Sequence, residues 1–268
     1  MAIRKFFKSG NLKLSYLDFG GNSNNILVCL HGHFGNGRMF SRVASSLKDW
    51  KVYAIDQRGH GWSEHPVDLD YSRESYLNDI FNFVKEINAS KITILGHSLG
   101  GVNAYQFASK YPELVNAMII EDIGAEVNGD NRFAINIPKN VESLKGLKGS
   151  LLELGISDTD YFCESAYETE SGWSFRFDCK GMDVSHQFLN GNWWKDWTIS
   201  DCPALLIHGL HSWVVKTEQI EKMARIRPNT KLKVFEESGH TIHDDNFDGF
   251  KEVVIDFLYE VSKKSSSV

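Results

Sequence analysis

The chain has 268 residues, of which 42% are hydrophobic and 24% are charged, and its 29 Lys and Arg against 35 Asp and Glu give a formal net charge of −6. This composition is that of a globular chain, long enough for one large domain or for one domain with an insertion, and it excludes a disordered chain. Nucleic-acid binding needs clustered Lys and Arg, and membrane insertion needs roughly 20 consecutive apolar residues, so the sequence argues against both.

The four cysteines form no C-x-x-C pair; they are Cys29, Cys163, Cys179 and Cys202. Reduced thiols in a cytoplasmic protein are the simplest interpretation. Residues 1–20 contain no apolar core of signal-peptide length, which favours the same compartment.

Seven short apolar runs predict strands. The first, at 12–17, alternates apolar and polar residues as a half-buried edge strand does. The other six are mainly apolar, which is typical of parallel strands buried on both faces, and lie at 26–30, 51–55, 92–95, 117–120, 204–207 and 232–235. Helical patterns fill the gaps at 38–48, 73–87, 99–110, 217–226 and 247–263. This alternation predicts an α/β fold with a mostly parallel central sheet and helices on both faces.

The alternation breaks between residues 125 and 202, which are richer in Asn, Ser, Glu and aromatic residues. We interpret residues 125–202 as a helical cap, or lid, inserted into a core made of residues 1–124 and 203–268. The aromatic side chains of this cap segment either wall an apolar pocket or bury the surface by which the cap docks on the sheet. The second interpretation is favoured for any single residue.

A G-x-S-x-G motif occupies residues 96–100, between a predicted strand and a predicted helix. A serine nucleophile needs such a strained strand-to-helix turn, and glycines flank it because side chains there would clash with neighbouring backbone. The pattern alone is only suggestive, since a plain glycine-rich turn also matches it, but the strand-turn-helix context raises its weight. Ser98 is therefore the candidate nucleophile.

A second glycine-containing loop follows the predicted strand at 26–30. Acyl transfer needs two backbone N–H groups aimed at the developing oxyanion, one from the residue after the nucleophile and one from this loop. We therefore expect the amides of Leu99 and His33 to form an oxyanion hole.

A metal site is the less favoured interpretation of the histidines in these loops. His31 and His33 form an H-x-H pair, and His208 and His211 invite the same idea. No carboxylate follows the first pair at short spacing, and the glycines indicate a loop rather than a strand. We expect no metal and no cofactor.

These motifs occur in the order and at the intervals of the α/β-hydrolase family, which the chain resembles over nearly its whole length. The resemblance is carried by His31-Gly32…Gly35, Asp56-x-Arg58-Gly59-x-Gly61-x-Ser63, Gly96-x-Ser98-x-Gly100-Gly101 and Gly239-His240. It implies a serine hydrolase in which His240, after the last strand, is the catalytic base, with a triad in the order Ser, acid, His.

The triad acid departs from the family's usual position, three residues past the glycine that ends the seventh strand, where this sequence has Ser212. Some α/β hydrolases place the acid after strand six, and the sequence resembles that branch of small carboxylesterases. Asp122 and Glu121 are the candidates there. Asp122 is preferred because its shorter side chain reaches from the loop just past the strand, and Ser212 would then support Asp122 and His240 with a hydrogen bond.

The favoured function is a serine hydrolase that cleaves carboxylic esters, of short or medium acyl chains, through an acyl-enzyme built on Ser98, Asp122 and His240. We expect a small-molecule ester as its partner. Phe34 and Trp213 are the best pocket candidates, because each lies beside a predicted catalytic loop.

Other functions stay open on the same scaffold, because fold does not determine chemistry. Lactonases, thioesterases, C–C hydrolases, cofactor-free haloperoxidases and lyases are alternatives within the enzymes. A small-molecule receptor that keeps the site for binding is an alternative of another class, and Ser212 in the usual acid position is the feature that favours it.

Overall fold

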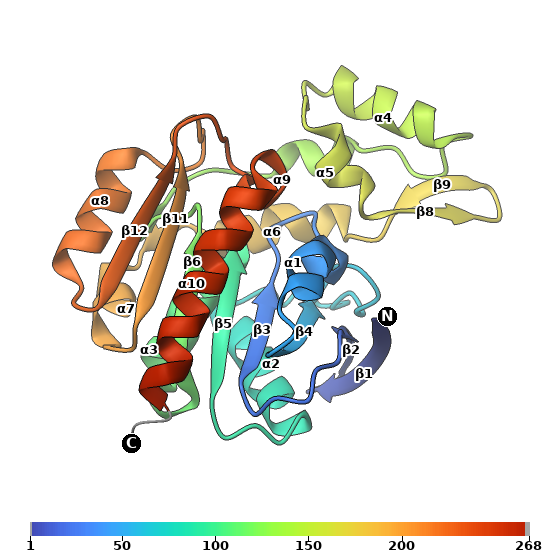
Figure 1. The fold of residues 1–268 in the computed structure, drawn as a ribbon. Helices are drawn as coiled ribbons and strands as arrows, with labels where there is room; N and C mark the ends of the chain where they lie inside the picture. The colour runs from blue at the N-terminus through green and yellow to red at the C-terminus, as the bar shows by residue number, and fades with distance from the viewer. Residues whose placement is uncertain (1, 266–268) are drawn as a thin grey trace.

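An eight-stranded sheet forms the centre of the structure, a computed structural model that describes residues 2–265 (Figure 1). The strand order is β1-β2-β4-β3-β5-β6-β11-β12; β1 and β2 pair antiparallel with their neighbours, and all other pairs are parallel. This topology confirms the predicted α/β fold. The strands are β1 (Ile3–Ser9), β2 (Leu12–Asp18), β3 (Ile26–Leu30), β4 (Lys51–Asp56), β5 (Ile92–His97), β6 (Val115–Glu121), β11 (Ala204–Gly209) and β12 (Thr230–Phe235).

Helices cover both faces of the sheet, because both faces are apolar. Successive side chains of β3 and β5 point to opposite faces, so that Leu27 and Leu95 join one buried cluster while Val28 and Ile94 join the other. α1 and α10 cover the first cluster, and α2, α3 and α8 cover the second. The helices of this layer structure are α1 (Ser41–Ser46), α2 (Arg73–Glu86), α3 (Leu99–Lys110), α8 (Thr217–Ile226), α9 (Ile242–Asp245) and α10 (Phe247–Ser265), with 3-10 turns at Gly37–Phe40 and Pro112–Leu114.

No helix between residues 2 and 265 has the combination of length and apolar character that a membrane span requires.

The edge of the sheet differs from the expectation. Residues 12–17 lie in β2, which pairs on both sides, and β1 forms the edge instead. The sequence pattern missed β1 because Phe7 is its one buried hydrophobic side chain, while Ile3 and Phe6 are exposed. A strand with so few buried positions has no clear alternation of apolar and polar residues.

The cap segment contains the expected helices and, in addition, short strands. The β8–β9 hairpin and the β7–β10 pair lie within it, and Figure 1 shows α4, α5 and the hairpin projecting beyond the sheet. Its elements are β7 (Glu126–Val127), a 3-10 helix (Arg132–Asn136), α4 (Leu144–Glu153), α5 (Thr159–Cys163), β8 (Ala166–Thr169), β9 (Gly172–Phe175), α6 (Cys179–Leu189), β10 (Gly191–Asn192) and α7 (Trp194–Ile199).

The last helix of the cap segment packs against the core. Trp197 of α7 is fully buried, its indole N–H donates to the Met223 carbonyl of α8 (2.9 Å), and its ring meets Tyr105 of α3 edge to face. Earlier in the segment, the Asp178 amide donates to the Gly59 carbonyl (2.8 Å). Hydrogen bonds and a large buried side chain therefore attach the cap segment to the layer below it.

Replacement of Trp197 tests this attachment. We expect Trp197→Ala to lower the free energy of unfolding by about 3–5 kcal/mol, because it leaves a large cavity and an unpaired carbonyl. Trp213→Ala is the matched control, since that indole is 85% exposed and its loss should change stability by no more than about 0.5 kcal/mol. Urea denaturation measures both, and equal effects would contradict the packing described.

Candidate active site

The turn at Ser98 is held in a strained backbone conformation. β5 ends at His97, Ser98 has φ +52°, and α3 begins at Leu99. A Cβ on Gly96 would lie 2.2 Å from the Gly100 carbonyl oxygen, so the turn can close only with glycine there. Left-handed backbone in a residue other than glycine is rare and is often found at functional sites.

The carboxylate of Asp122 gathers side chains from the ends of neighbouring strands. Asp122 follows β6, has φ +51° and is fully buried. Its Oδ2 accepts hydrogen bonds from His240 Nδ1 (2.7 Å) and Ser212 Oγ (2.5 Å). Its Oδ1 accepts from His208 Nδ1 (2.7 Å) and from the Gly209 amide (3.3 Å). Four donors thus surround one buried carboxylate.

These donors keep Asp122 ionised. Burial alone would raise the pKa of the carboxyl group, but the hydrogen bonds from His208, His240 and Ser212 outweigh it and lower the pKa below its ordinary value. Because His240 donates through Nδ1, its Nε2 is the atom available as a base. Within residues 2–265, neither His240 Nε2 nor Ser98 Oγ has a hydrogen-bond partner in the protein. The hydrogen bond between a nucleophile and its base is often long before substrate binds.

The loop after β3 passes directly beside Ser98. A Cβ built on Gly32 would lie 3.1 Å from Ser98 Cβ. The cap segment holds the next two carbonyls of this loop: Tyr161 Oη donates to the His33 carbonyl (2.9 Å) and Ser165 Oγ to the Phe34 carbonyl (2.6 Å).

The two amides expected to form the oxyanion hole have no competing acceptor. In the described part of the chain, neither the His33 amide nor the Leu99 amide donates a hydrogen bond to another protein group. The His33 ring is buried, bonds to Ser185 Oγ through Nε2 (2.9 Å) and stacks on His186 of α6. Its side chain therefore anchors the loop to the cap segment.

The two pocket candidates have opposite environments. Phe34 is buried and packs against three phenylalanines of the cap segment, Phe133, Phe162 and Phe177. Trp213 is 85% exposed, with its ring centre 5.7 Å from that of His240. Phe34 thus belongs to the contact between core and cap segment, and Trp213 stands in solvent beside His240.

Two of the histidines considered as metal ligands, His31 and His208, have protein partners on both ring nitrogens. His31 Nε2 accepts from the Gln57 amide (3.0 Å) and its Nδ1 bonds to the Gly32 carbonyl (2.7 Å). Burial lowers the pKa of His31 to about 4, so the ring is neutral. His208 Nε2 bonds to Thr217 Oγ1 (2.9 Å), while its Nδ1 serves Asp122. Neither ring has a free nitrogen for a metal.

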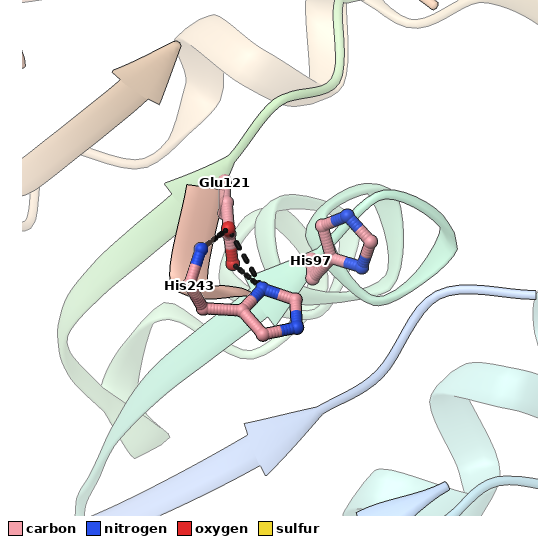
Figure 2. A group of neighbouring side chains, drawn as sticks. All are labelled: His97, Glu121 and His243. Atoms are coloured by element: carbon pink, nitrogen blue, oxygen red, sulfur yellow. Dashed lines mark hydrogen bonds and ion pairs between the residues drawn. The ribbon is translucent and has the colours of Figure 1, made fainter. Parts of the chain in front are cut away.

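Glu121, the other acid candidate, has a different partner. Its Oε1 accepts from both the amide (2.9 Å) and Nδ1 (2.8 Å) of His243, as Figure 2 shows. His97 completes this buried group, and its Nε2 donates to the His240 carbonyl (3.0 Å). The structure therefore directs Asp122 to His240 and Glu121 to His243.

Sequence reasoning missed the roles of His208 and His243. His208 lies near the end of the predicted strand at 204–207, on the neighbour of the strand that precedes Asp122, so the strand order could have revealed it. His243 stands three residues after His240, and this Gly-His-x-x-His spacing is the sequence signal that points to it.

Comparison with known proteins agrees with this architecture. The model of the family described as alpha/beta hydrolase fold matches residues 25–145, from β3 through Ser98 and Asp122 into α4. The chain has the α/β-hydrolase fold and is similar to members of that family.

Proteins similar to this chain carry several names. A Bacillus subtilis protein provisionally named 2-succinyl-6-hydroxy-2,4-cyclohexadiene-1-carboxylate synthase is 25% identical, covering 94% of this chain and 97% of its own. A Haemophilus influenzae protein provisionally named esterase/lipase is 26% identical, covering 87% and 83%. The solved structure of E-2-(acetamidomethylene)succinate hydrolase superposes with a TM-score of 0.84 at 21% identity, covering 96% and 99%. The esterase- and lipase-like relatives support a hydrolase activity.

The ion pair of Glu121 and His243 predicts a loss of stability in alkali. Burial alone lowers a histidine pKa, but at His243 the charge and hydrogen bond of Glu121, with Asp244 and Asp245 nearby, raise the pKa to about 9. An unfolded histidine has a pKa of about 6.5. The stabilisation is therefore complete below about pH 6.5 and is lost as the pH rises through about 9.

We expect this group to lower the free energy of unfolding by about 2 kcal/mol between pH 7 and pH 10. Urea denaturation of wild type and His243→Asn over this pH range measures the effect. The difference between the two proteins separates the contribution of His243 from that of other titrating groups. Curves that stay parallel across the range would contradict the assignment.

Proposed function

We propose that this α/β hydrolase is a serine esterase, which cleaves carboxylic esters through a covalent acyl-enzyme. The observation that carries the proposal is the 2.7 Å hydrogen bond from His240 Nδ1 to the buried Asp122 carboxylate, at the same sheet end as the strained Ser98 turn. A buried acid, a histidine with a free Nε2 and a half-buried serine on a strained turn are the parts that acyl transfer needs. The H. influenzae relative with an esterase/lipase name supports the same class.

In the first half of the reaction, Ser98 Oγ attacks the ester carbonyl carbon while His240 Nε2 takes its proton. The ionised Asp122 stabilises the imidazolium that forms and keeps the proton on Nδ1. The amides of His33 and Leu99 donate to the oxyanion of the tetrahedral intermediate. Collapse of that intermediate expels the alcohol, which receives its proton from His240.

In the second half, water attacks the acyl-enzyme. His240 takes a proton from the water, and the same two amides, of His33 and Leu99, stabilise the second oxyanion. Ser98 leaves with the proton returned by His240, so that the carboxylic acid departs and the site is restored. No step requires a cofactor.

The surroundings support an apolar substrate of modest size. Trp213 stands exposed beside His240, where an indole can cover an acyl or alcohol group. Phe34 and its phenylalanine neighbours pack together on the side of the loop after β3 that faces the cap segment. We therefore propose esters of short or medium acyl chains.

A fluorophosphonate probe together with a series of p-nitrophenyl acyl esters tests the proposal. We expect the probe to modify Ser98, found by mass spectrometry of the digested protein, and ester turnover to disappear in Ser98→Ala. Absence of both labelling and turnover would contradict the esterase proposal and favour a receptor. Labelling with poor turnover of every ester would indicate a lactone, thioester or C–C substrate instead.

The choice of acid is tested by Asp122→Asn, Ser212→Ala and the control Asp201→Asn, which alters an exposed aspartate. We expect Asp122→Asn to lower kcat by about 10⁴-fold, because the wrong tautomer of His240 is favoured. Ser212→Ala removes one hydrogen bond to the carboxylate and should cost about tenfold. Esterase assays that leave Asp122→Asn within a few-fold of the control would show that the acid lies elsewhere.

A further inference from the structure

Two consecutive carboxylates end β6, and they serve different parts of one loop. Glu121 and Asp122 are both fully buried. Asp122 binds the ring of His240, whereas Glu121 binds His243, three residues later in α9. The left-handed turn at Asp122 allows the two side chains to diverge toward these partners.

Three hydrogen bonds fix the main chain on both sides of His240. The His243 amide donates to Glu121 Oε1 (2.9 Å). His97 Nε2 donates to the carbonyl of His240 itself (3.0 Å), and the Gly239 amide donates to Asp245 Oδ2 (2.7 Å). Two of these bonds tie the segment 239–245 to Glu121 and His97, and the third joins the two ends of the segment.

Two of these partners, His97 and Glu121, also contact the turn that carries Ser98. His97 precedes Ser98, and the Ser98 amide donates to the Glu121 carbonyl (2.9 Å). The ring centre of His97 lies 4.6 Å from that of His240 and 5.0 Å from that of His243. Figure 2 shows His97, Glu121 and His243 grouped at the end of the sheet. Glu121 therefore contacts the turn at Ser98 through its backbone carbonyl and the loop of His240 through its side chain.

Stability alone does not account for this ion pair. Burying a carboxylate and an imidazolium costs desolvation energy that their attraction roughly offsets, so the pair has no net stability advantage over well-packed apolar side chains in its place. Because Glu121 Oε1 accepts from the main chain and the ring of the same residue, the pair instead selects one conformation of the loop.

We propose that Glu121 and His243 are positioning residues for His240, which fix its loop so that the ring faces Ser98 and Asp122. Both side chains are buried and act through the loop rather than on substrate. The inference rests on the proposed function, in which His240 is the base. Since misplacement of a catalytic group by about 1 Å can cost 10²-fold, loss of the pair should reduce kcat and leave KM nearly unchanged.

A bound metal ion is the rival explanation of this cluster. His97, Glu121 and His243 offer ligand atoms within 4.8 Å of one another. However, Glu121 Oε1 already accepts two hydrogen bonds from His243, and Oε2 lies 3.0 Å from His243 Nδ1. Metal content is therefore measured in the same experiment.

The test compares wild type with Glu121→Ala, Glu121→Gln and His243→Asn, and with Glu237→Gln as a control at an exposed carboxylate three residues before His240. We expect Glu121→Ala to lower kcat about 10–100-fold with KM within about twofold, and the phosphonate labelling rate to fall in parallel. Glu121→Gln should recover part of this loss, because its amide oxygen still accepts from the His243 amide. Hydrogen exchange of the backbone at 239–245 should accelerate in every Glu121 and His243 variant.

Equal kcat for Glu121→Ala and Glu237→Gln, per folded molecule, would overturn the proposal, as would unchanged hydrogen exchange at 239–245. If Glu121→Ala fails to fold, Glu121→Gln and His243→Asn carry the same comparison. A stoichiometric metal ion in wild type, whose removal lowers the labelling rate, would also overturn it. Failure of the proposed function gives a different result, because wild type would then neither react with the phosphonate probe nor hydrolyse esters. In that case the hydrogen-exchange rates at 239–245 alone would decide whether Glu121 fixes the loop.

Discussion

The buried carboxylate of Asp122 is the interaction on which the site depends. A charged group with no exposure is tolerable only when donors surround it. Here the donors come from the end of β11 and from the loops that follow β11 and β12, while Asp122 itself follows β6. The strand order β5-β6-β11-β12 makes these ends adjacent, and Ser98 follows β5, the neighbour of β6. The charge therefore needs these strand ends to be packed together.

The cap segment contributes to the same geometry through the loop after β3. Two hydroxyls, from Tyr161 and Ser165, hold the carbonyls of His33 and Phe34. The space is tight, since a Cβ on Gly32 would lie 2.8 Å from Tyr161 Oη. Because the carbonyls are held from the cap side, the loop cannot turn without breaking bonds that buried groups require. The cap segment thus shapes the core loop as well as covering it.

Much of the fold could be predicted from the sequence, because buried parallel strands have nearly continuous apolar runs and the helices between them have a clear period. The candidate residues Ser98, Asp122 and His240 could be predicted for the same reason, since each follows a predicted strand. β1 was missed because it buries too little. The hairpin in the cap segment was missed because its strands are short and half-exposed.

The hydrogen-bond partners of these residues were harder to predict from the sequence. The sequence does not contain the strand order, and only that order makes His208 a neighbour of Asp122. The preference for Asp122 over Glu121 rested on side-chain length, whereas their different partners follow a left-handed turn at Asp122 that no residue type requires. Local pattern identifies residues at the site, and long-range packing decides which of them meet.

A crystal structure of the phosphonate-modified protein tests the central claim most directly, because the bound phosphoryl group stands in for the tetrahedral intermediate. The account predicts a bond from phosphorus to Ser98 Oγ. It also predicts a phosphoryl oxygen about 2.7–3.1 Å from the amides of both His33 and Leu99, and His240 still bonded to Asp122. Attachment to another residue, or an oxygen that faces neither amide, would contradict it.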